Sequence, residues 1–379
     1  MAESTTVALR TTVAANRSTI YSEPIDILGM VTKSEIVGAK AASHSPENAA
    51  ITGCSSPESL RNRFEHALTT LTFPKSPTAL YGPIRYILNG GGKRIRPILM
   101  LMSGELFQGD IETLLPAALA VEIFHAATLV HDDFMDAASL RRGRTTVHKK
   151  WGPSIAILAG DALTGTSYTL LNQTPPASLP AALNVFNTAT SSIYEGQSLD
   201  LDFEARSVEA VTLEDYLEMI SLKTAALFAG ALQIGALLSK APDADQERLH
   251  QFGKALGIAF QLQDDLLDVF GSTTDFGKTI GGDILANKKT FLLLKAYDLA
   301  KPDMRAAMDR LLQLPSSEAN EKIQGMKEVF VHLNVKAAAE HERDRLIEEA
   351  LDQLDAVAVS KERKTALKNL ALQLGRRHA

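Results

Sequence analysis

The sequence predicts an all-α fold, and three observations support this class. From about Pro57 onward, apolar residues recur at intervals of three and four, which is the spacing of one face of a helix. No window shows convincing alternation of apolar and polar residues, the pattern of a half-buried strand. The composition, 45% hydrophobic and 22% charged residues, lies in the globular range. We therefore expect long helices around a large shared core.

The helices expected from this periodicity follow one another along the chain at residues 60–71, 82–88, 96–106, 114–135, 155–171, 180–196, 213–238, 245–269 and 289–299. Thr212, followed three residues later by Asp215, is a start signal for one of them, and Asp243 is a start signal for the next. Prolines and glycines punctuate the segments at Pro83, Pro116, Pro153, Pro175, Pro176, Pro242, Gly281 and Gly282. Pro116 lies just inside a helix start, where its missing N–H is tolerated.

The first part of the chain differs in character from the rest. Residues 1–58 show no sustained period and are rich in small and polar residues, so we expect a mostly disordered extension before a helical domain at 59–379. The first residues contain Arg10 and Arg17 with only one acid, a composition that also suits an organelle transit peptide. We otherwise expect a cytoplasmic protein. No run of about 18 uncharged apolar residues occurs, so no membrane span is expected.

Charge and cysteine content exclude several classes of protein. The formal net charge of −6 gives no overall attraction to nucleic acid or to an anionic membrane. Any anionic ligand must therefore bind to local basic clusters. The single cysteine, Cys54, can form neither an internal disulfide nor a cysteine-based metal site.

Two acidic clusters carry the same pattern at positions i, i+1 and i+4. The first, HDDFMD, contains Asp132, Asp133 and Asp136, and the second, QDDLLD, contains Asp264, Asp265 and Asp268. On a helix, i and i+4 differ by about 40° in azimuth and about 6 Å in rise, so the outer aspartates of each cluster face the same way. Grouped carboxylates in apolar segments need compensating cations, and Mg2+ prefers such oxygen ligands together with water and phosphate. A solvated acidic helix face is the alternative.

Basic residues accompany both clusters. The stretch GGGKRIRP, at residues 90–97, would let the backbone approach an anion while Lys93 and Arg96 project from a helix start. Further basic residues follow each cluster or lie between them, namely Arg141, Arg142, Arg144, Lys223, Lys278 and Lys288. His125 precedes Asp132 by two helical turns and shares its face. Both signs of charge together suit a diphosphate bridged by metal.

In order along the chain, GGGKRIRP, EIFH, HDDFMD, RRG, GDAL, EGQSLDL, LKT, FQLQDDLLDVFG and GKTIGGDILANKKT resemble the motifs of the trans-isoprenyl diphosphate synthases. The resemblance extends from about Pro57 to the C-terminus. It implies a single antiparallel helical bundle around a deep central cavity, the type I isoprenoid synthase fold. It also implies a homodimer and three Mg2+ ions per active site.

The resemblance also implies a role for each motif residue. Asp132, Asp136 and Asp264 would bind metal and act in catalysis, with Asp268 in support. Isopentenyl diphosphate would be held by Lys93, Arg96, His125 and Arg142. The allylic diphosphate would be held by Arg141, Lys223, Thr224, Gln261, Lys278 and Lys288, among which Lys223 and Lys278 also belong to the catalytic set.

The reaction implied is the head-to-tail condensation of isopentenyl diphosphate with an allylic diphosphate. Metal ions and basic side chains would stabilise the diphosphate as it leaves, and the isopentenyl double bond would attack the resulting cation. Residues just upstream of the first aspartate would form the floor of the cavity. Ala127 and Thr128 are small there, and Phe124 lies about one turn deeper, so we expect a product of about C20. A C15 or a longer product is the alternative, as is a Phe124 that only packs in the core.

Two other functions share part of this pattern. A class I terpene cyclase would have the same fold but would lack GGGKRIRP and the second aspartate cluster. A non-catalytic subunit of a synthase would lack one acidic cluster, whereas this chain has both.

Overall fold

A computed structural model describes residues 54–271 and 281–375 of the chain. The chain divides into two compact units, residues 1–48 with 72–74, and residues 49–71 with 75–379. The architecture below is that of the second unit. Most of the extension expected at residues 1–58 lies outside the described residues. Helix α1 begins at Pro57, so the first residues of this helix lie before the expected boundary.

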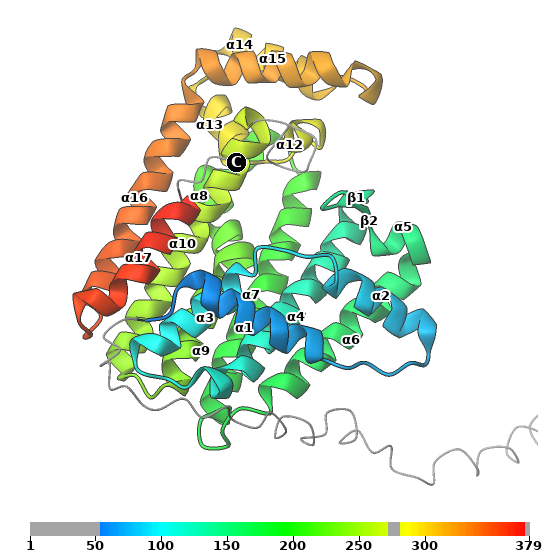
Figure 1. Ribbon diagram of the computed structural model, residues 1–379. Coiled ribbons are helices and arrows are strands. Elements are labelled where there is room, and N and C mark those ends of the chain that lie inside the picture. The colour runs from blue at the N-terminus through cyan, green and yellow to red at the C-terminus, as the bar shows by residue number, and fades with distance from the viewer. Residues whose placement is uncertain (1–53, 272–280, 376–379) are drawn as a thin grey trace, which may run out of the picture. The chain divides into compact units, whose positions relative to one another are not determined.

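The described residues form an almost entirely helical unit with one two-stranded hairpin (Figure 1). The α-helices are α1 (Pro57–Thr70), α2 (Thr78–Leu88), α3 (Ile95–Leu106), α4 (Ile111–Met135), α5 (Val147–Trp151), α6 (Pro153–Leu171), α7 (Leu179–Ala205), α8 (Leu213–Ile220), α9 (Ala226–Leu238), α10 (Asp243–Phe270), α12 (Gly282–Leu285), α13 (Phe291–Leu299), α14 (Pro302–Leu312), α15 (Ala319–His332), α16 (Val335–Ala356) and α17 (Lys361–Gly375). The shorter elements are the strands β1 (Leu140–Arg141) and β2 (Arg144–Thr145), the 3₁₀ turns η2 (Val208–Ala210) and η4 (Ser316–Glu318), and the π turn η3 (Ser221–Ala225).

The all-α prediction is confirmed, and most of the expected helices agree with the structure to within a few residues. Three differences stand out. The segment expected at 213–238 contains the π turn η3 between α8 and α9. Helix α7 continues beyond residue 196 to Ala205. The helices after residue 299 were not assigned from the sequence.

Capping residues explain several helix starts. The Thr212 side chain accepts a hydrogen bond from the Asp215 backbone N–H, and the Asp215 carboxylate accepts one from the Thr212 backbone N–H, which confirms the expected start of α8. Asp243, in contrast, lies in the first turn of α10, after the N-cap Pro242. A break at Pro83 is wrong because α2 continues through this residue, and Pro83, Ile84 and Leu88 are buried along it.

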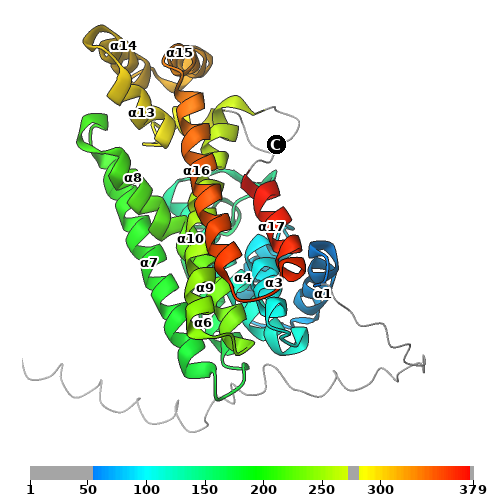
Figure 2. The ribbon, with the colours of Figure 1, turned by 90° about the vertical axis from the view of Figure 1, so that its left-hand side faces the viewer.

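Helix α9 forms the centre of the packing. It contacts α3, α4, α7 and α10, and apolar residues cover nearly all of its surface, as expected for a helix buried on every side. Helix α16 lies along α10 (Figures 1 and 2). Because α4, α7 and α10 surround α9, their polar positions at one end can face one another.

Two helical segments are long and apolar enough to cross a membrane, at Ile111–Met135 and Leu213–Leu238. Within this unit, 72% and 61% of their apolar windows are buried. Both segments therefore serve as core helices of the bundle, with α4 and α9 contacting each other.

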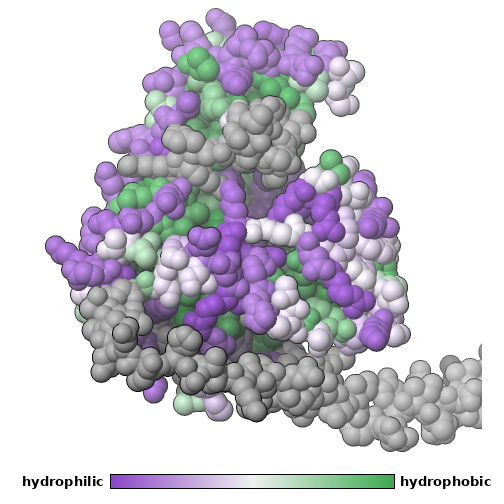
Figure 3. Space-filling view, viewed as in Figure 1, coloured by the Kyte–Doolittle hydropathy of each residue, from purple (hydrophilic) through white to green (hydrophobic). Residues whose placement is uncertain are grey.

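The β1–β2 hairpin directly follows α4. Arg142 and Gly143 form its turn, both with positive φ values, 52° and 71°. This is the backbone of a type I′ turn, which matches the twist of the two strands. The turn brings the arginines at 141, 142 and 144 close to the end of α4. The surface is hollowed beside the hairpin, and the residues around this hollow are mostly hydrophilic (Figure 3).

Candidate active site

The aspartates at the end of α4 face two directions. Asp132 Oδ1 lies 3.3 Å from Lys223 Nζ of η3. Asp133 is buried, accepts a hydrogen bond from Arg141 Nε at 2.7 Å and forms an ion pair with Arg141 Nη2 at 2.6 Å. Asp136 caps the helix, and burial followed by the charge of Asp132 raises its pKa. Asp133 thus fixes Arg141, which leaves Asp132 and Asp136 as the pair that can bind cations.

The second cluster on α10 is divided in the same way. Asp265 is buried and accepts hydrogen bonds from the Tyr216 hydroxyl and from Gln261 Nε2, the latter at 3.0 Å. Burial, followed by the charge of Asp283, raises the pKa of Asp265 to about 7. Asp268 Oδ2 accepts the backbone N–H of Asp283 at 3.0 Å, at the start of α12. The middle aspartate again has a structural role, and Asp264 and Asp268 remain as possible metal ligands.

Asp200 of α7 joins two of the expected lysines. Its Oδ2 lies 2.6 Å from Lys223 Nζ and 3.9 Å from Lys288 Nζ. Burial opposes ionisation of Asp200, but the charges of Lys288 and Lys223 lower its pKa. Burial likewise opposes the charge of Lys288, yet Asp200 and Asp283 raise its pKa. Asp200 was not among the expected site residues, although its motif, EGQSLDL, was noted in the sequence.

The π turn η3 places Lys223 and Thr224 in this site. Thr224 Oγ1 donates to Gln261 Oε1 at 3.1 Å, which connects η3 to α10. A Cβ added at Gly196 of α7 would lie 2.3 Å from the Lys223 backbone nitrogen, so only glycine allows α7 to approach so closely. Isolated π turns inside helices are frequent at functional sites. Here the turn brings Lys223 between the aspartates of α4 and α7.

A second group of basic residues lines a pocket beside α4. Its walls include Gly90 and Arg94 of the α2–α3 loop, His125 of α4, and Arg142 of the hairpin. Burial, followed by the charges of Arg96 and Arg142, lowers the pKa of His125 well below its usual value. His125 is therefore neutral at pH 7. Its Nε2 lies 3.2 Å from Arg96 Nη1 and must act as the acceptor, which places the ring proton on Nδ1.

Arg142 lines this pocket, and Arg96 adjoins it through His125. Arg96 Nε is buried without a hydrogen-bond partner, and the guanidinium carbon lies 4.7 Å from the centroid of the Phe228 ring. Burial lowers the pKa of Arg96 to about 10, so it still carries its charge at pH 7. Arg142 Nη1 donates to the Gly91 carbonyl oxygen, and a Cβ at Gly92 would lie 2.6 Å from Arg142 Nη1. The glycines of GGGKRIRP therefore make room for an arginine as well as for a ligand.

Comparison with known proteins decides the family. A family model described as polyprenyl synthetase matches residues 77–330. The chain belongs to the polyprenyl synthetase family. A geranylgeranyl diphosphate synthase of Methanosarcina mazei is 39% identical over 246 residues, which cover 64% of this chain and 75% of the relative. The large subunit 1 of a chloroplastic heterodimeric geranylgeranyl pyrophosphate synthase of Arabidopsis thaliana is 37% identical over 259 residues, with coverages of 64% and 70%.

Solved structures show the same polyprenyl synthetase fold. A crystal structure of a geranylgeranyl pyrophosphate synthase aligns with a TM-score of 0.81 at 38% identity and covers 86% of this chain and all of that one. The geranylgeranyl pyrophosphate synthetase of Pyrococcus horikoshii aligns with a TM-score of 0.77 at 32% identity, with coverages of 84% and 99%. As a polyprenyl synthetase with the type I isoprenoid fold, the chain is a prenyltransferase.

The carboxylates of this synthetase fit Mg2+. Within residues 54–271 and 281–375, no three His, Cys, Asp or Glu side chains come together as a closed metal cage. The outer aspartates instead offer only hard oxygen ligands, in a pair on α4 and a pair on α10. Mg2+ characteristically takes one or two carboxylates and fills its other positions with water and substrate phosphate. The donor set therefore suits an ion shared with a diphosphate.

Two expected phosphate ligands of the synthetase remain outside these contacts. Lys278 lies outside the described residues. Lys93 is exposed in the α2–α3 loop, next to the buried Arg94. Arg94 was not among the expected site residues, and its contacts have their own consequence below.

The residues expected to form the cavity floor lie on α4, upstream of Asp132. Phe124 is fully buried, and its ring packs edge-on against Phe186 and Tyr194 of α7, with centroid distances of 5.5 and 6.2 Å. Ala127 is 1% exposed, and Thr128 Oγ1 donates to the His125 carbonyl oxygen at 2.8 Å. Phe124 thus belongs to an aromatic contact between α4 and α7. Its role in limiting the product remains a prediction.

Proposed function

We propose that this prenyltransferase condenses isopentenyl diphosphate with an allylic diphosphate to give a product of about C20. One observation carries the proposal: cationic side chains gather in two groups along α4. Arg96 and Arg142 lie beside His125, while Lys223 and Lys288 lie beside Asp132 and Asp200, two helical turns farther along. Two anionic substrates that must react with each other need two such neighbouring sites.

The aspartate side would bind the allylic diphosphate. Asp132, Asp136, Asp264 and Asp268 would hold Mg2+, which stabilises the charge on the departing diphosphate. Lys223 and Lys288 would contact the phosphate oxygens, and Thr224 and Gln261 would keep η3 in register with α10. Arg141, fixed by Asp133, and Lys278 would add to the same site. The carbon–oxygen bond breaks, and the negative charge stays on the bound diphosphate.

The basic pocket would bind isopentenyl diphosphate. Arg96 Nε has no partner, Arg142 is braced by the loop, and the Nδ1 proton of neutral His125 is available to a phosphate oxygen. Lys93 would reach the same anion from the exposed loop. The double bond attacks the allylic carbon, a new carbon–carbon bond forms, and the released pyrophosphate takes the proton that is lost. Holding both substrates side by side supplies much of the rate.

The product length follows from the position of Phe124. One helical turn is about 5.4 Å, close to the length of one isoprene unit. Because residues 127 and 128 are small, the floor of the cavity would lie one turn deeper, at Phe124, and the product would be one isoprene unit longer. Relatives include several geranylgeranyl diphosphate synthases and a geranylfarnesyl diphosphate synthase of Natronomonas pharaonis at 40% identity. Phe124→Ala should lengthen the product, whereas an unchanged product would contradict the floor.

A homodimer is the expected assembly. Helices α6 and α7 expose large apolar residues in this chain: Ile157, Leu158, Tyr194 and Leu201 are 39–53% exposed. Tyr194 and Leu201 are seven residues apart and so share one face of α7. Sedimentation of Leu158→Glu should show a monomer. Val331→Glu, at a 63% exposed residue of α15, is the matched control and should leave the dimer intact.

A cytoplasmic location is proposed as well. A fluorescent protein fused after residue 58 should remain in the cytosol. Its import into an organelle would instead identify residues 1–58 as a targeting segment.

The deciding experiment is incubation with isopentenyl diphosphate, each allylic diphosphate and Mg2+, with analysis of product length. Chain elongation supports the proposal, and chelation of Mg2+ should abolish this elongation. Release of pyrophosphate with a cyclic hydrocarbon would identify a cyclase. If no primer is elongated, the proposal is refuted, and the result favours a non-catalytic subunit of a synthase.

A further inference from the structure

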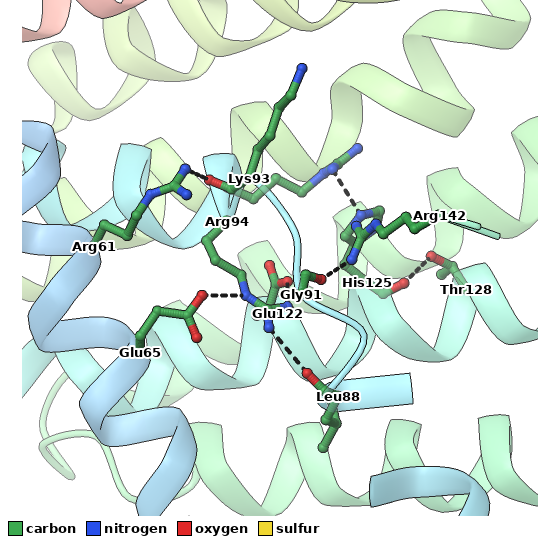
Figure 4. A network of polar contacts seen from close by, with 11 residues as sticks. Arg61, Glu65, Leu88, Gly91, Lys93, Arg94, Glu122, His125, Thr128 and Arg142 are labelled. Carbon is green, nitrogen blue, oxygen red and sulfur yellow. Dashed lines mark hydrogen bonds and ion pairs between the residues drawn. The ribbon is translucent and has the colours of Figure 1, made fainter. Parts of the chain in front are cut away.

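The Arg94 guanidinium connects three elements in the wall of the basic pocket. Its Nη1 donates to Glu122 Oε1 of α4 at 2.6 Å, its Nε donates to Glu65 Oε1 of α1 at 2.9 Å, and its Nη2 donates to the Leu88 carbonyl oxygen at the end of α2 at 3.1 Å. Figure 4 shows the side chain turned inward, away from the Lys93 side chain. The side chain of Arg94 is only 5% exposed, and its three nitrogens each donate to a protein acceptor.

The loop that carries Arg94 has an unusual backbone. Gly91, Gly92 and Arg94 have positive φ values of 71°, 148° and 50°. Glycine adopts such values freely, but an arginine does so at a cost, and it persists there only when its surroundings hold it. Three hydrogen bonds from one guanidinium provide that hold. Arg94 is also the N-cap of α3, so its backbone conformation determines the directions in which the Lys93 and Arg96 side chains leave the main chain.

Glu122 is the carboxylate beneath this group of arginines. Its side chain is 5% exposed, and burial raises its pKa while Arg94, Arg96 and Arg142 act in the opposite direction. Glu122 also lies one helical turn before His125 on α4. Its charge offsets part of the repulsion among the arginines, and its contact with Arg94 anchors the loop to the helix that bears His125.

We propose that Arg94 and Glu122 form a positioning pair for isopentenyl diphosphate. Both side chains lie in the wall of the basic pocket, but the Nε, Nη1 and Nη2 groups of Arg94 already donate to protein acceptors, so the pair acts on the loop and not on the substrate. By fixing the α2–α3 loop against α4, it sets Lys93 and Arg96 at the distance from His125 and Arg142 that one diphosphate requires. This inference rests on the proposed function, because it assumes that the basic pocket binds isopentenyl diphosphate.

The test is a comparison of steady-state constants for Glu122→Gln and wild type. Glutamine keeps the shape and an oxygen that accepts from Arg94 but removes the charge. We expect KM for isopentenyl diphosphate to rise about tenfold, by analogy with the lower part of the range for residues that orient the ligands of a metal ion. KM for the allylic diphosphate and the product length should not change. A role in stability alone would lower kcat and leave both KM values unchanged.

Glu112→Gln is the matched control. Glu112 also joins α4 to a basic side chain, Arg63 of α1, at 2.6 Å, but this ion pair lies outside the loop and the Glu112 side chain is 64% exposed. This variant should keep both KM values. If Glu122→Gln and Glu112→Gln have the same KM for isopentenyl diphosphate, the positioning role is refuted.

Two further measurements keep the outcome decisive. If Glu122→Gln does not fold, Glu65→Gln replaces it. The Glu65 side chain is 38% exposed, and its substitution weakens another of the hydrogen bonds that hold the Arg94 guanidinium. The KM of this variant for isopentenyl diphosphate then decides the inference in the same way. Wild type is assayed first. Failure of wild type to elongate any primer refutes the proposed function, whereas elongation by wild type without a selective change in the variants refutes the positioning pair alone.

Discussion

Asp200→Asn tests whether one buried carboxylate organises the allylic side of the site. Asp200 Oδ2 lies 2.6 Å from Lys223 Nζ and 3.9 Å from Lys288 Nζ, and the substitution removes its charge with little change of shape. Removing one partner of a buried ion pair typically costs about 3–5 kcal/mol. Lys223 keeps Asp132 at 3.3 Å, and the Lys288 side chain is 33% exposed. We therefore expect a smaller loss of about 2–3 kcal/mol in the free energy of unfolding.

The substitution should lower activity as well as stability. Without Asp200, Lys223 has only Asp132 as a partner and competes with Mg2+ for that carboxylate. We expect kcat/KM for the allylic diphosphate to fall about 10- to 100-fold, as for other residues that orient a ligand-binding group.

Urea unfolding and steady-state kinetics measure the two effects. Asp202→Asn is the control, because Asp202 lies on the same helix and pairs with Arg206 on the surface, where an ion pair contributes about 0–1 kcal/mol. Equal losses in the two variants would show that Asp200 does not organise the lysines.

Two other predictions concern close packing and pH. Gly196→Ala should destabilise the protein by about 1–3 kcal/mol and lower turnover, since its Cβ would lie 2.3 Å from the Lys223 backbone nitrogen. The control Gly165→Ala, whose Cβ would meet no atom within 4 Å, should not destabilise it. Equal unfolding midpoints for the two variants would contradict this prediction. The pKa of the Asp265 carboxyl is about 7 in the folded protein and 3.8 ordinarily. Between these two pH values the folded protein holds a proton that the unfolded chain has lost. The free energy of unfolding therefore falls as the pH rises through this range. Asp265→Asn should thus gain stability relative to wild type as the pH rises from about 4 to about 7 in urea unfolding without metal, and a constant difference over this range would refute the assignment.

Local sequence signals predicted most of the fold because helix periodicity and caps are local. The Thr212 and Asp215 pair defines the start of α8 without help from the rest of the chain. Pro83 shows the limit of such signals. Burial along α2 outweighs one missing backbone hydrogen bond, and burial depends on helices far away in the sequence.

The site shows the same division. Helical spacing separated the outer aspartates from Asp133 and Asp265, whose contacts confirm that they face other directions. The roles of Arg94 and Asp200 depend on partners 28 and 23 residues away, and no local pattern encodes such a pairing. The π turn also could not be recognised from apolar periodicity, because apolar residues continue from α8 on one side of it to α9 on the other.

This π turn fixes the orientation of the helix that follows it. Deleting one residue from η3 would restore a regular helix and rotate everything after it by about 100°. Helix α9 is apolar on nearly every side, yet Gly235 approaches α3 so closely that a Cβ there would lie 2.2 Å from the Met100 carbonyl oxygen. The rotation would therefore press a larger side chain into that contact while it turned Lys223 and Thr224 out of the site. The length of this segment sets the packing of the bundle and the chemistry of the site together.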